Sequence, residues 1–254
     1  MKNRHLFSRR SALAFATSLA LGLSATGNSV IAADKQPVVV ELFTSQGCSS
    51  CPPADKLLGE LANQKNIISL SLNVDYWDYL GWRDTLGSSK HSKRQKQYAA
   101  NRGTRQVYTP QMIINGHVDV VGSRRGKVIT ALNNESDSGA RVPLTISETS
   151  AEITINVAES PNSELAKKAT VWVLVTSPKI SVPVERGENR GKKITYHNVV
   201  RQMTPAGMWD GKAISITLPK DGLGISNGRD CIVLLQEGTV GKVIGAVRMS
   251  DLKT

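Results

Sequence analysis

The fold of this chain is decided by residues 37–58, PVVVELFTSQGCSSCPPADKLL. The run from Pro37 to Phe43 is apolar and rich in β-branched residues, which predicts a strand buried on both faces. The segment that follows repeats apolar residues at helical spacing and predicts an amphipathic helix, with Ala54, Leu57, Leu58 and Leu61 on its buried face. Cys48 and Cys51 therefore lie in the turn between a strand and the N-terminus of a helix.

The position of the two cysteines predicts redox chemistry. Unpaired N–H groups and the dipole at a helix N-terminus stabilise a thiolate, which lowers its pKa and makes it nucleophilic near neutral pH. The C-x-x-C spacing lets the second sulfur resolve a mixed disulfide formed by the first. We expect Cys48 to be the attacking, more exposed thiol and Cys51 the buried resolving thiol. A helix that begins only at Pro52 would leave Cys48 farther from the dipole and weaken its activation.

The rest of the N-terminal half alternates strand and helix patterns. Residues 67–74 predict a second strand, and residues 112–121 predict a hairpin with Asn115-Gly116 as its type I′ turn. Residues 88–101 are polar and basic and predict an exposed helix, whose solvated face carries Lys90, His91, Lys93, Arg94 and Lys96. We assign this mixed α/β order to a domain over residues 34–138.

The segment after residue 140 is rich in strand patterns. Ile153, Ile155 and Val157 alternate with polar residues, and apolar runs at 169–175, 214–218, 231–235 and 244–247 predict further strands. Helix patterns are nearly absent. We therefore expect a smaller all-β unit, a sandwich or a sheet, over residues 139–254, with the polar segment 133–139 as the linker.

The strand, the C-x-x-C turn and the helix together resemble the thioredoxin superfamily. A second landmark is YTPQ at 108–111, which precedes an apolar strand as the cis-proline loop of thioredoxins does. The resemblance implies a thioredoxin-like domain with a central mixed sheet flanked by helices. It also implies a cis Thr109–Pro110 bond against the cysteines, with the backbone of Thr109 contacting substrate. Glu41, an acid within the apolar strand, would accept the proton of Cys51; a glutamate turned to solvent is the alternative.

Four longer motifs resemble a narrower family. They are ELFTSQGCSSCPPAD at 41–55, VDYWDYLGWRD at 74–84, YTPQMIINGH at 108–117 and GENRGKKITYHNVVR at 187–201. They are similar to a family of exported bacterial proteins catalogued only as a domain of unknown function (number twelve twenty-three). The resemblance covers nearly the whole mature chain. It implies a thioredoxin-like fold plus a C-terminal β unit, and no established activity.

Residues 1–33 have the pattern of a signal peptide. A basic start with Arg9 and Arg10 precedes the apolar run 12–23, and small residues lead to an A-x-A-like cleavage site after Ala32 or Ala33. The run is too short and too interrupted to favour a membrane-spanning helix, with a retained amphipathic anchor as the alternative. The paired arginines leave the twin-arginine and the unfolded export routes open. We expect a periplasmic or secreted protein.

Charge and cysteine content narrow the class of protein. The formal net charge is +11, and four of the positive charges lie in residues 1–33, which leaves +7 for the mature chain. This charge is spread out, which favours acidic partners or an anionic envelope surface over nucleic acid. Three cysteines are too few for a disulfide scaffold, and Cys231, in an apolar run, is expected to be buried and inert. The sequence lacks the G-x-S-x-G, P-loop and Rossmann fingerprints of hydrolases, nucleotide-binding proteins and dehydrogenases.

Two further segments are candidates for the site. Tyr76, Trp77 and the aromatics beside them follow the second strand, and they either wall a substrate groove beside the cysteines or form a hydrophobic lid on the sheet edge. The loop 187–191, GENRG, is expected to dock the β unit onto the first domain, with ligand binding as the alternative.

These patterns predict an exported thiol–disulfide oxidoreductase that acts on protein thiols or disulfides in the cell envelope. It needs no cofactor beyond Cys48 and Cys51, and another redox protein regenerates it. One alternative is a Cu(I) or other soft-metal site with His117 or His197 as a third ligand. The other is a non-catalytic binding module in which the cysteine pair is a structural staple.

Overall fold

The computed structural model describes residues 36–136, 141–161, 168–225 and 229–252. The expected signal peptide, residues 1–33, lies outside the described residues, and so does the end of the expected linker, residues 137–139. Within the described ranges, no helix is long and apolar enough to span a membrane.

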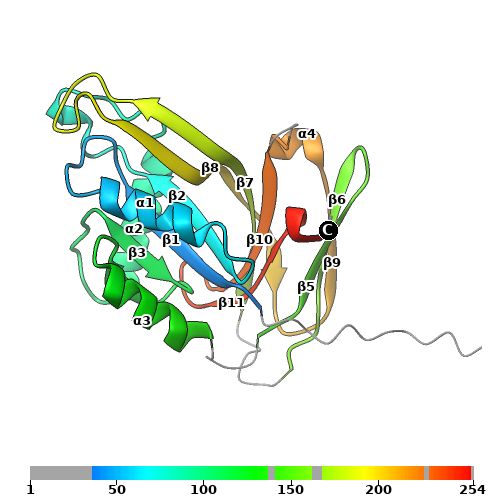
Figure 1. Cartoon of the computed structure of the whole chain (residues 1–254). Helices are drawn as coiled ribbons and strands as arrows, with labels where there is room; N and C mark the ends of the chain where they lie inside the picture. The colour runs from blue at the N-terminus through cyan, green and yellow to red at the C-terminus, as the bar shows by residue number, and fades with distance from the viewer. Residues whose placement is uncertain (1–35, 137–140, 162–167, 226–228, 253–254) are drawn as a thin grey trace, which may run out of the picture. The chain divides into compact units, whose positions relative to one another are not determined.

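Strands from both halves of the chain form one mixed sheet. Across the described residues it has eight strands in the order β11–β10–β7–β8–β2–β1–β3–β4 (Figure 1). They are β1 (Val38–Thr44), β2 (Ile67–Asn73), β3 (Gln111–Ile114), β4 (Val118–Val121), β7 (Ala169–Pro183), β8 (Lys193–Trp209), β10 (Asp230–Glu237) and β11 (Val243–Arg248). β1 runs parallel to β2 and antiparallel to β3. A central strand with neighbours on both sides explains the continuous apolar run of β1.

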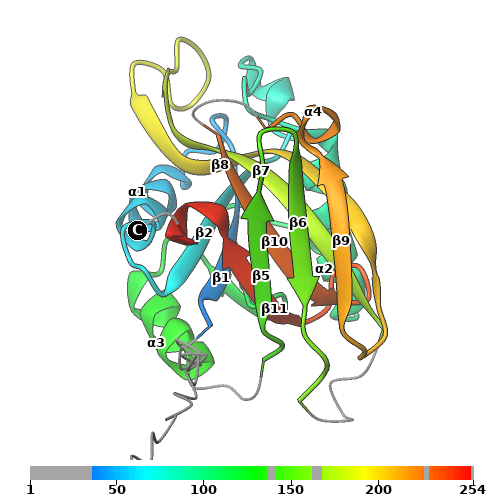
Figure 2. The same ribbon diagram turned by 90° about the vertical axis from the view of Figure 1, so that its right-hand side faces the viewer.

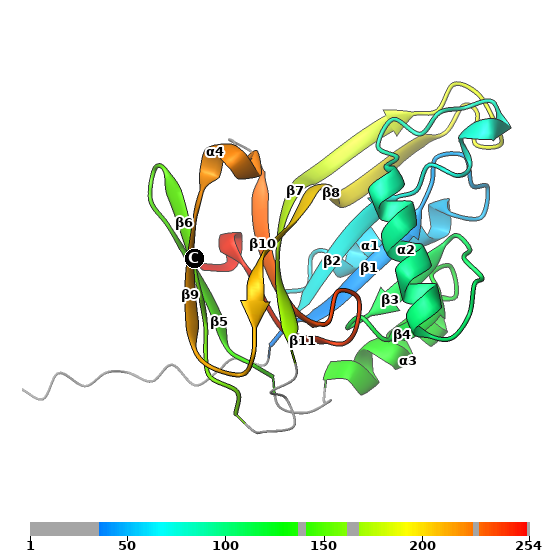
Figure 3. The same ribbon diagram turned by 180° about the vertical axis from the view of Figure 1, so that it is seen from behind.

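The alternation of side chains along β1 decides which helix covers each face of the sheet. Val38, Val40 and Leu42 pack under α1 (Pro52–Leu61) and α3 (Arg125–Ser136). Val39 and Phe43 point to the other face, which α2 (Ser89–Asn101) covers with Tyr98. Figures 1 and 3 show α1 and α3 in front of the sheet and α2 behind it. The mixed α/β class with helices on both faces of a central sheet is therefore confirmed.

A second sheet packs on the far end of the first. It consists of β5 (Leu144–Glu148), β6 (Glu152–Val157) and β9 (Ile214–Pro219), in the order β5–β6–β9 (Figure 2). Apolar side chains of this sheet share a core with residues of β7, β8 and β10; the core includes Ile153, Ile155, Val173, Trp209 and Val233. The short helices are η1 (Asp78–Leu80), α4 (Lys220–Leu223) and η3 (Met249–Leu252). The C-terminal half is thus β-rich and includes a sandwich.

The boundary expected between residues 138 and 139 does not separate two sheets. β8 pairs in parallel with β2 through Ser71 and Val199, so the C-terminal half continues the N-terminal sheet. Residues 33–254 cluster as one compact unit. The expected linker is wrong over residues 133–136, which form the last turn of α3. Asn133 and Asn134 are poor helix formers, and the packing of Val128 and Leu132 on the sheet outweighs that propensity.

Two local predictions from the sequence have opposite outcomes. The hairpin is confirmed, because β3 and β4 pair and the φ angles of 44° at Asn115 and 75° at Gly116 fit a type I′ turn. The solvated helix is wrong for part of α2, which buries His91 and Arg94 against the sheet. The sequence pattern does not reveal the buried face, because that face is polar. Its Arg94 is paired with Glu41 on β1 and Gln236 on β10.

Candidate functional site

Cys48 and Cys51 form a disulfide at the N-terminus of α1. Cys51 caps the helix, and Pro52 and Pro53 occupy its first two positions. Proline fits there because the first N–H groups of a helix have no intrahelical acceptor. Cys48 lies one turn earlier, and its carbonyl accepts a hydrogen bond from the Cys51 N–H at 3.2 Å. The helix therefore begins at Pro52, and its dipole acts more directly on Cys51 than on Cys48.

The two sulfur-bearing residues are almost covered. Cys48 is 3% exposed and Cys51 is fully buried, whereas Ser49 and Ser50 are exposed. The Ser50 hydroxyl lies 3.4 Å from Cys48 Sγ, close enough to hydrogen-bond the sulfur. Cys48 is the more exposed of the two cysteines, as expected. With only 3% of Cys48 exposed, another protein could reach its sulfur only if the residues that cover it moved.

Trp77 links the cysteine turn to the cis-proline loop. The Thr109–Pro110 bond is cis, as the resemblance implies. Trp77 Nε1 donates to Thr109 Oγ1 at 2.8 Å. A Cβ at Gly47, next to Cys48, would come within 3.0 Å of Trp77 Cβ, so this glycine lets the tryptophan approach the cysteine turn. The structure thus brings Cys48, Trp77 and Thr109 together.

The other aromatics after β2 have separate positions. Tyr76 turns toward α2, where its hydroxyl donates to Gln95 Oε1 at 3.1 Å. Tyr79 is 77% exposed and stacks on Trp77 with the ring centroids 6.3 Å apart. Of the two aromatics expected to contact substrate, Trp77 lies beside the cysteine turn and Tyr76 packs between the sheet and α2.

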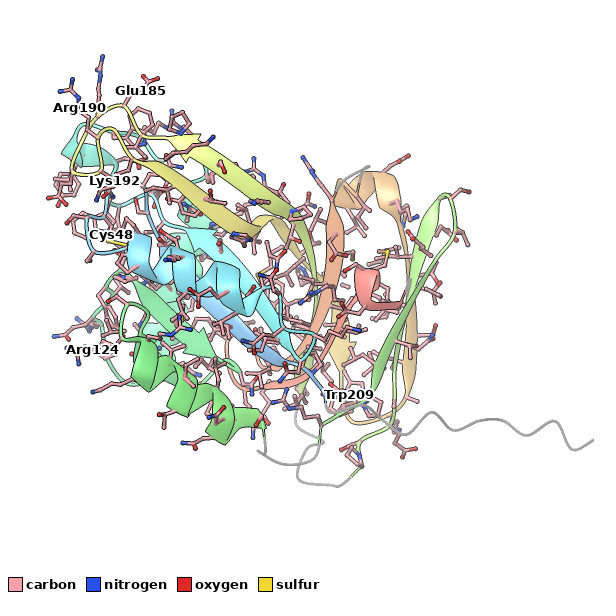
Figure 4. The ribbon with its side chains drawn as sticks, in the orientation of Figure 1. Cys48, Arg124, Glu185, Arg190, Lys192 and Trp209 are labelled. Carbon is pink, nitrogen blue, oxygen red and sulfur yellow. A yellow bond between two sulfur atoms is a disulfide. The ribbon has the colours of Figure 1, made fainter. Side chains whose placement is uncertain are left out.

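A loop from the C-terminal half lies over the cysteine turn. Residues 184–192 connect β7 to β8, and Asn189 on this loop is fully buried. Its Nδ2 donates to the carbonyls of Gln46 and Cys48 at 2.9 and 2.8 Å. The carboxylate of Glu188 accepts from the Ser49 N–H at 3.3 Å. Figure 4 shows Cys48 at the end of α1 and Lys192, on this loop, above it.

Asn189 was missed by the sequence reasoning, which treated residues 187–191 as a docking loop, with ligand binding as the alternative, and gave no role to Asn189. The loop does dock, and its target is the turn that carries Cys48 and Cys51. Asn189 Oδ1 accepts from Lys192 Nζ at 2.9 Å, which fixes the orientation of the amide toward the two carbonyls. A hydrogen bond across 141 positions of sequence has no local signal that could reveal it.

Asp55 is a buried acid on the same face of α1 as Cys51. It is 2% exposed and follows Cys51 by four residues, one helical turn. Thr44 Oγ1 donates to its Oδ1 at 2.7 Å, while Oδ2 has no hydrogen-bond partner among the described residues. Burial raises the pKa of Asp55 to about 8; the Thr44 hydrogen bond lowers it and the charge of Asp84 raises it further. A carboxyl of this kind exchanges protons near neutral pH.

Asp84 is a second buried acid that contacts the cysteine turn. It is 4% exposed, and its carboxylate accepts from the Gln46 N–H at 2.7 Å and from Asn73 Nδ2 at 3.0 Å. Burial raises its pKa, and these hydrogen bonds partly offset the rise. Trp82 Nε1 donates to Gln46 Oε1 at 2.8 Å. Asp84 therefore fixes the backbone two residues before Cys48.

The position of Glu41 corrects its expected role. It is buried, but it lies on the α2 face of the sheet, opposite α1 and the buried side of Cys51. Arg94 Nε donates to Oε1 at 2.6 Å and Nη2 to Oε2 at 3.0 Å, and the Tyr98 hydroxyl also donates to Oε2. Side chains alternate along β1, and Val40 and Leu42, on either side of Glu41, pack against α1. Glu41 therefore faces away from α1. Glu41 is half of a buried ion pair, and Asp55 takes the position expected of the acid.

Asp55 has a signal in the sequence itself. Its spacing of four from Cys51 places both on one helix face, and that face also carries Leu58. An acid among apolar residues on the buried side of a helix is unusual and points to a function. The sequence reasoning looked for the acid in the strand because thioredoxins carry it there.

The remaining candidates lie away from the cysteine pair. His117 contacts Glu135, with Nε2 3.3 Å from Oε1. His197 lies against Gly59 in the second half of α1. Cys231 is buried in β10, as expected, and burial raises its pKa to about 12, so it stays a thiol. In the described part of the chain, no three His, Cys, Asp or Glu side chains gather in a group that could hold a metal.

A family model described as "Protein of unknown function (DUF1223)" matches residues 39–236. The chain belongs to this family. The match contains the cysteine pair, Asp55, the cis-proline loop and Asn189, so the whole candidate site lies within the DUF1223 region. The resemblance drawn from the four motifs is thereby confirmed.

Two solved structures are similar to this DUF1223 chain. The X-ray crystal structure of protein AGR_C_4864 from Agrobacterium tumefaciens is 34% identical, with a TM-score of 0.72, over 85% of this chain and 95% of that one. HBP35 of Porphyromonas gingivalis is 13% identical with a TM-score of 0.56, over 85% of this chain and 75% of that one, and supports the fold alone. A comparison with curated proteins gave no match.

Proposed function

We propose that this protein is an exported thiol–disulfide oxidoreductase, built on a thioredoxin-like arrangement, that acts on protein thiols or disulfides in the cell envelope. The observation that carries the proposal is the disulfide between Cys48 and Cys51 at a strand–helix junction. Trp77 links this turn to the cis-proline loop, and the buried acid Asp55 lies one helical turn after Cys51. A merely structural staple would not require the protonatable Asp55 on the resolving side. The signal peptide pattern supports an envelope location, where disulfides persist.

The cysteine pair supplies the whole redox reaction. In the reduced protein, the Cys48 thiolate attacks a client disulfide, forms a mixed disulfide and releases one client thiolate, which is then protonated. Cys51 loses its proton and attacks Cys48 Sγ, which releases the second client thiolate. Two electrons and two protons pass from the Cys48–Cys51 dithiol to the client. The reverse sequence oxidises a client dithiol, and the reduction potential decides which direction prevails.

Asp55 is the group proposed to take the proton from Cys51. The two residues share one face of α1, and burial raises the pKa of Asp55 to about 8. At pH 7 a minority of the molecules carry the carboxylate that accepts a proton, and the fraction rises with pH. In the reverse direction the protonated carboxyl returns the proton to the Cys51 thiolate.

The client is proposed to bind where Trp77 and the cis-proline loop meet the cysteine turn. Thr109 presents its backbone there, as the thioredoxin resemblance implies, and Pro110 fixes the loop. Because Cys48 is 3% exposed, binding requires the loop 184–192 or Trp77 to move aside. The exposed Tyr79 ring beside Trp77 offers apolar surface for a client segment.

The proposal is tested by trapping clients on the attacking cysteine. In a Cys51→Ser, Cys231→Ser variant the mixed disulfide on Cys48 cannot be resolved, so covalent complexes should accumulate in envelope extracts and disappear on reduction. The matched control is Cys48→Ser, Cys231→Ser, which keeps Cys51 and lacks the attacking thiol. Complexes in the first variant alone support the proposal. Equal trapping by both variants, or by neither, contradicts it.

A non-catalytic binding module is the second candidate, and the burial of Cys48 favours it. Asn189 and Glu188 cover the turn, as they would cover a structural staple. The two functions differ in how the disulfide responds to thiols, because a staple resists exchange even with the loop displaced.

A further inference from the structure

A pocket lies between α2 and the β7–β8 hairpin, on the face of the sheet opposite α1. Its volume is about 260 Å³, and α2, β7, β8 and the turn before β11 contribute to its wall. Figure 3 shows α2 on this side of the sheet, with β7 and β8 next to it. The residues that matter for its chemistry are Lys90, Lys93, Arg94, Trp172, Arg201 and Met203.

The pocket is strongly basic. Lys90, Lys93 and Arg201 form no ion pair with any of the described residues, and no Asp or Glu is among the residues that line it. The fourth cation, Arg94, is neutralised by Glu41 beneath it. Three unpaired cations around one concave site attract an anion more strongly than the same charges spread over a surface.

The pocket also has an apolar wall. Trp172 and Met203 are partly buried and pack against the core under α2. The Arg94 guanidinium carbon lies 5.9 Å from the centre of the Trp172 ring. The indole N–H of Trp172 is buried and has no acceptor among the described residues. A basic helix face that only solvates the protein needs neither an apolar wall nor a concave shape.

We propose that this pocket binds a small organic anion, in which a carboxylate or similar group is attached to an aromatic or other flat apolar body. The anionic group would lie among Lys90, Lys93 and Arg201, and the apolar body would lie against Trp172 and Met203. The site is separate from the cysteine pair, and it does not depend on the proposed redox function.

The test uses naphthoate as the probe and its neutral analogue naphthalenemethanol as the comparison, each titrated into the purified protein by calorimetry. We expect naphthoate to bind once per chain and at least tenfold more tightly than the neutral analogue. A Lys93→Glu, Arg201→Glu variant should weaken naphthoate binding at least tenfold. The matched control is Lys96→Glu, Lys212→Glu, which reverses two exposed cations outside the pocket and changes the net charge by the same amount; it should leave the affinity unchanged within twofold.

Three results would overturn the proposal. The first is an affinity for naphthoate that the pocket variant and the control variant change equally, because binding would then reflect net charge alone. The second is competition by inorganic phosphate at an equal affinity, which would show a simple anion site without a role for the apolar wall. The third is no naphthoate binding to a wild-type protein that shows a normal cooperative unfolding transition.

Discussion

Two buried acids, Glu41 and Asp55, differ in what each could contribute to the proposed thiol–disulfide reaction. Both lie close to β1, but the alternation of the strand and the start of α1 place them on opposite faces of the sheet. Glu41 is neutralised by Arg94, whereas one oxygen of Asp55 has no hydrogen-bond partner among the described residues. Of these two acids, Asp55 is the one on the same helix face as Cys51, and it is the one proposed to exchange a proton with Cys51.

Replacing Asp55 should slow the resolution of the mixed disulfide. We expect Asp55→Asn to reduce the rate at least about tenfold at pH 7, because general acid–base groups contribute factors of about 100 or more. The measurement is stopped-flow release of glutathione after the reduced Cys231→Ser protein meets oxidised glutathione. The wild-type rate should rise with pH through about 8, and the variant should lose this rise.

The control for this rate is Glu41→Gln, which keeps the hydrogen-bonding shape on the other face of the sheet. It should leave the resolution rate unchanged within about twofold. If Glu41→Gln slowed resolution and Asp55→Asn did not, the assignment of the acid to α1 would be wrong.

Asp55 should also make stability depend on pH. Its pKa is raised in the folded protein, so between the ordinary value of 3.8 and about 8 the folded state holds a proton that the unfolded state has lost. Rising pH therefore favours unfolding over this range, by up to about 1.4 kcal/mol per pH unit. Urea unfolding between pH 5 and pH 8 should show this decline in the wild type and a flatter profile in Asp55→Asn. Parallel profiles would contradict the raised pKa.

At the scale of elements, the Glu41–Arg94 ion pair fixes α2 to the sheet. Arg94 Nη2 also donates to Tyr98 Oη and to Gln236 Oε1, so one side chain connects β1, α2 and β10. Removing one partner of a buried pair leaves the other charge unpaired. We expect Arg94→Met to lower the free energy of unfolding by about 3–5 kcal/mol, measured by urea denaturation.

Two comparisons separate this effect from a general loss of charge. Lys96→Met, on the exposed side of α2, should change stability by no more than about 0.5 kcal/mol. The Glu41→Leu, Arg94→Met double variant should be more stable than Arg94→Met alone, because no unpaired charge is left. A double variant that is less stable than the single one would refute this account of the pair.

The loop between β7 and β8 should control access to Cys48. Asn189→Ala removes two hydrogen bonds to the cysteine turn and should speed reduction of the disulfide by a soluble phosphine several-fold. It should also cost about 1–3 kcal/mol of stability, because two carbonyls lose a buried donor. Arg190→Ala, the exposed neighbour, is the matched control and should change neither quantity. Equal reduction rates in all three proteins would show that the loop does not limit access.

The outcome at each element shows what sequence patterns capture. Local patterns predicted β1, α1, β2 and the β3–β4 hairpin, because apolar spacing and turn residues act within a few positions. They missed β8, in which Pro205 lies beside a bulge opposite Trp172, one of the few places where a strand accepts proline. They gave no sign of Asn189, because its position over Cys48 depends on which distant segments meet. The acid was sought in the strand because the thioredoxin resemblance places it there. The thioredoxin resemblance implied the cis-proline, whereas the signal of Asp55 was local, an acid on the apolar face of a helix four residues after Cys51.

At the scale of the whole molecule, the two halves depend on each other. β8 pairs with β2, and Leu174, Val200, Ile232 and Leu234 share a core with residues of β1 and β2. We expect residues 34–138 alone to show no cooperative unfolding transition by circular dichroism. The fragment would lack the apolar side chains that β7, β8 and β10 contribute to this core. A fragment that unfolded cooperatively at the wild-type temperature would restore the boundary at residue 138 as a division between independent domains.

The same coupling bears on the proposed function, because the turn with Cys48 and Cys51 belongs to one half of the chain and the loop that covers it belongs to the other. The loop 184–192 extends from the two longest strands of the sheet, so the position of Asn189 over Cys48 depends on the packing of the C-terminal half. A protein built this way can restrict its disulfide to partners that displace the loop.

The central claim, that Cys48 and Cys51 are an exchanging redox pair, is tested most directly by a redox titration of the mature Cys231→Ser protein, with both thiols followed by alkylation and mass. We expect a reversible couple between roughly −120 and −270 mV, the range of known oxidoreductases, and the measured potential would give the direction of the reaction. A disulfide below about −300 mV, or a pair that does not exchange, would contradict the account and leave a structural staple.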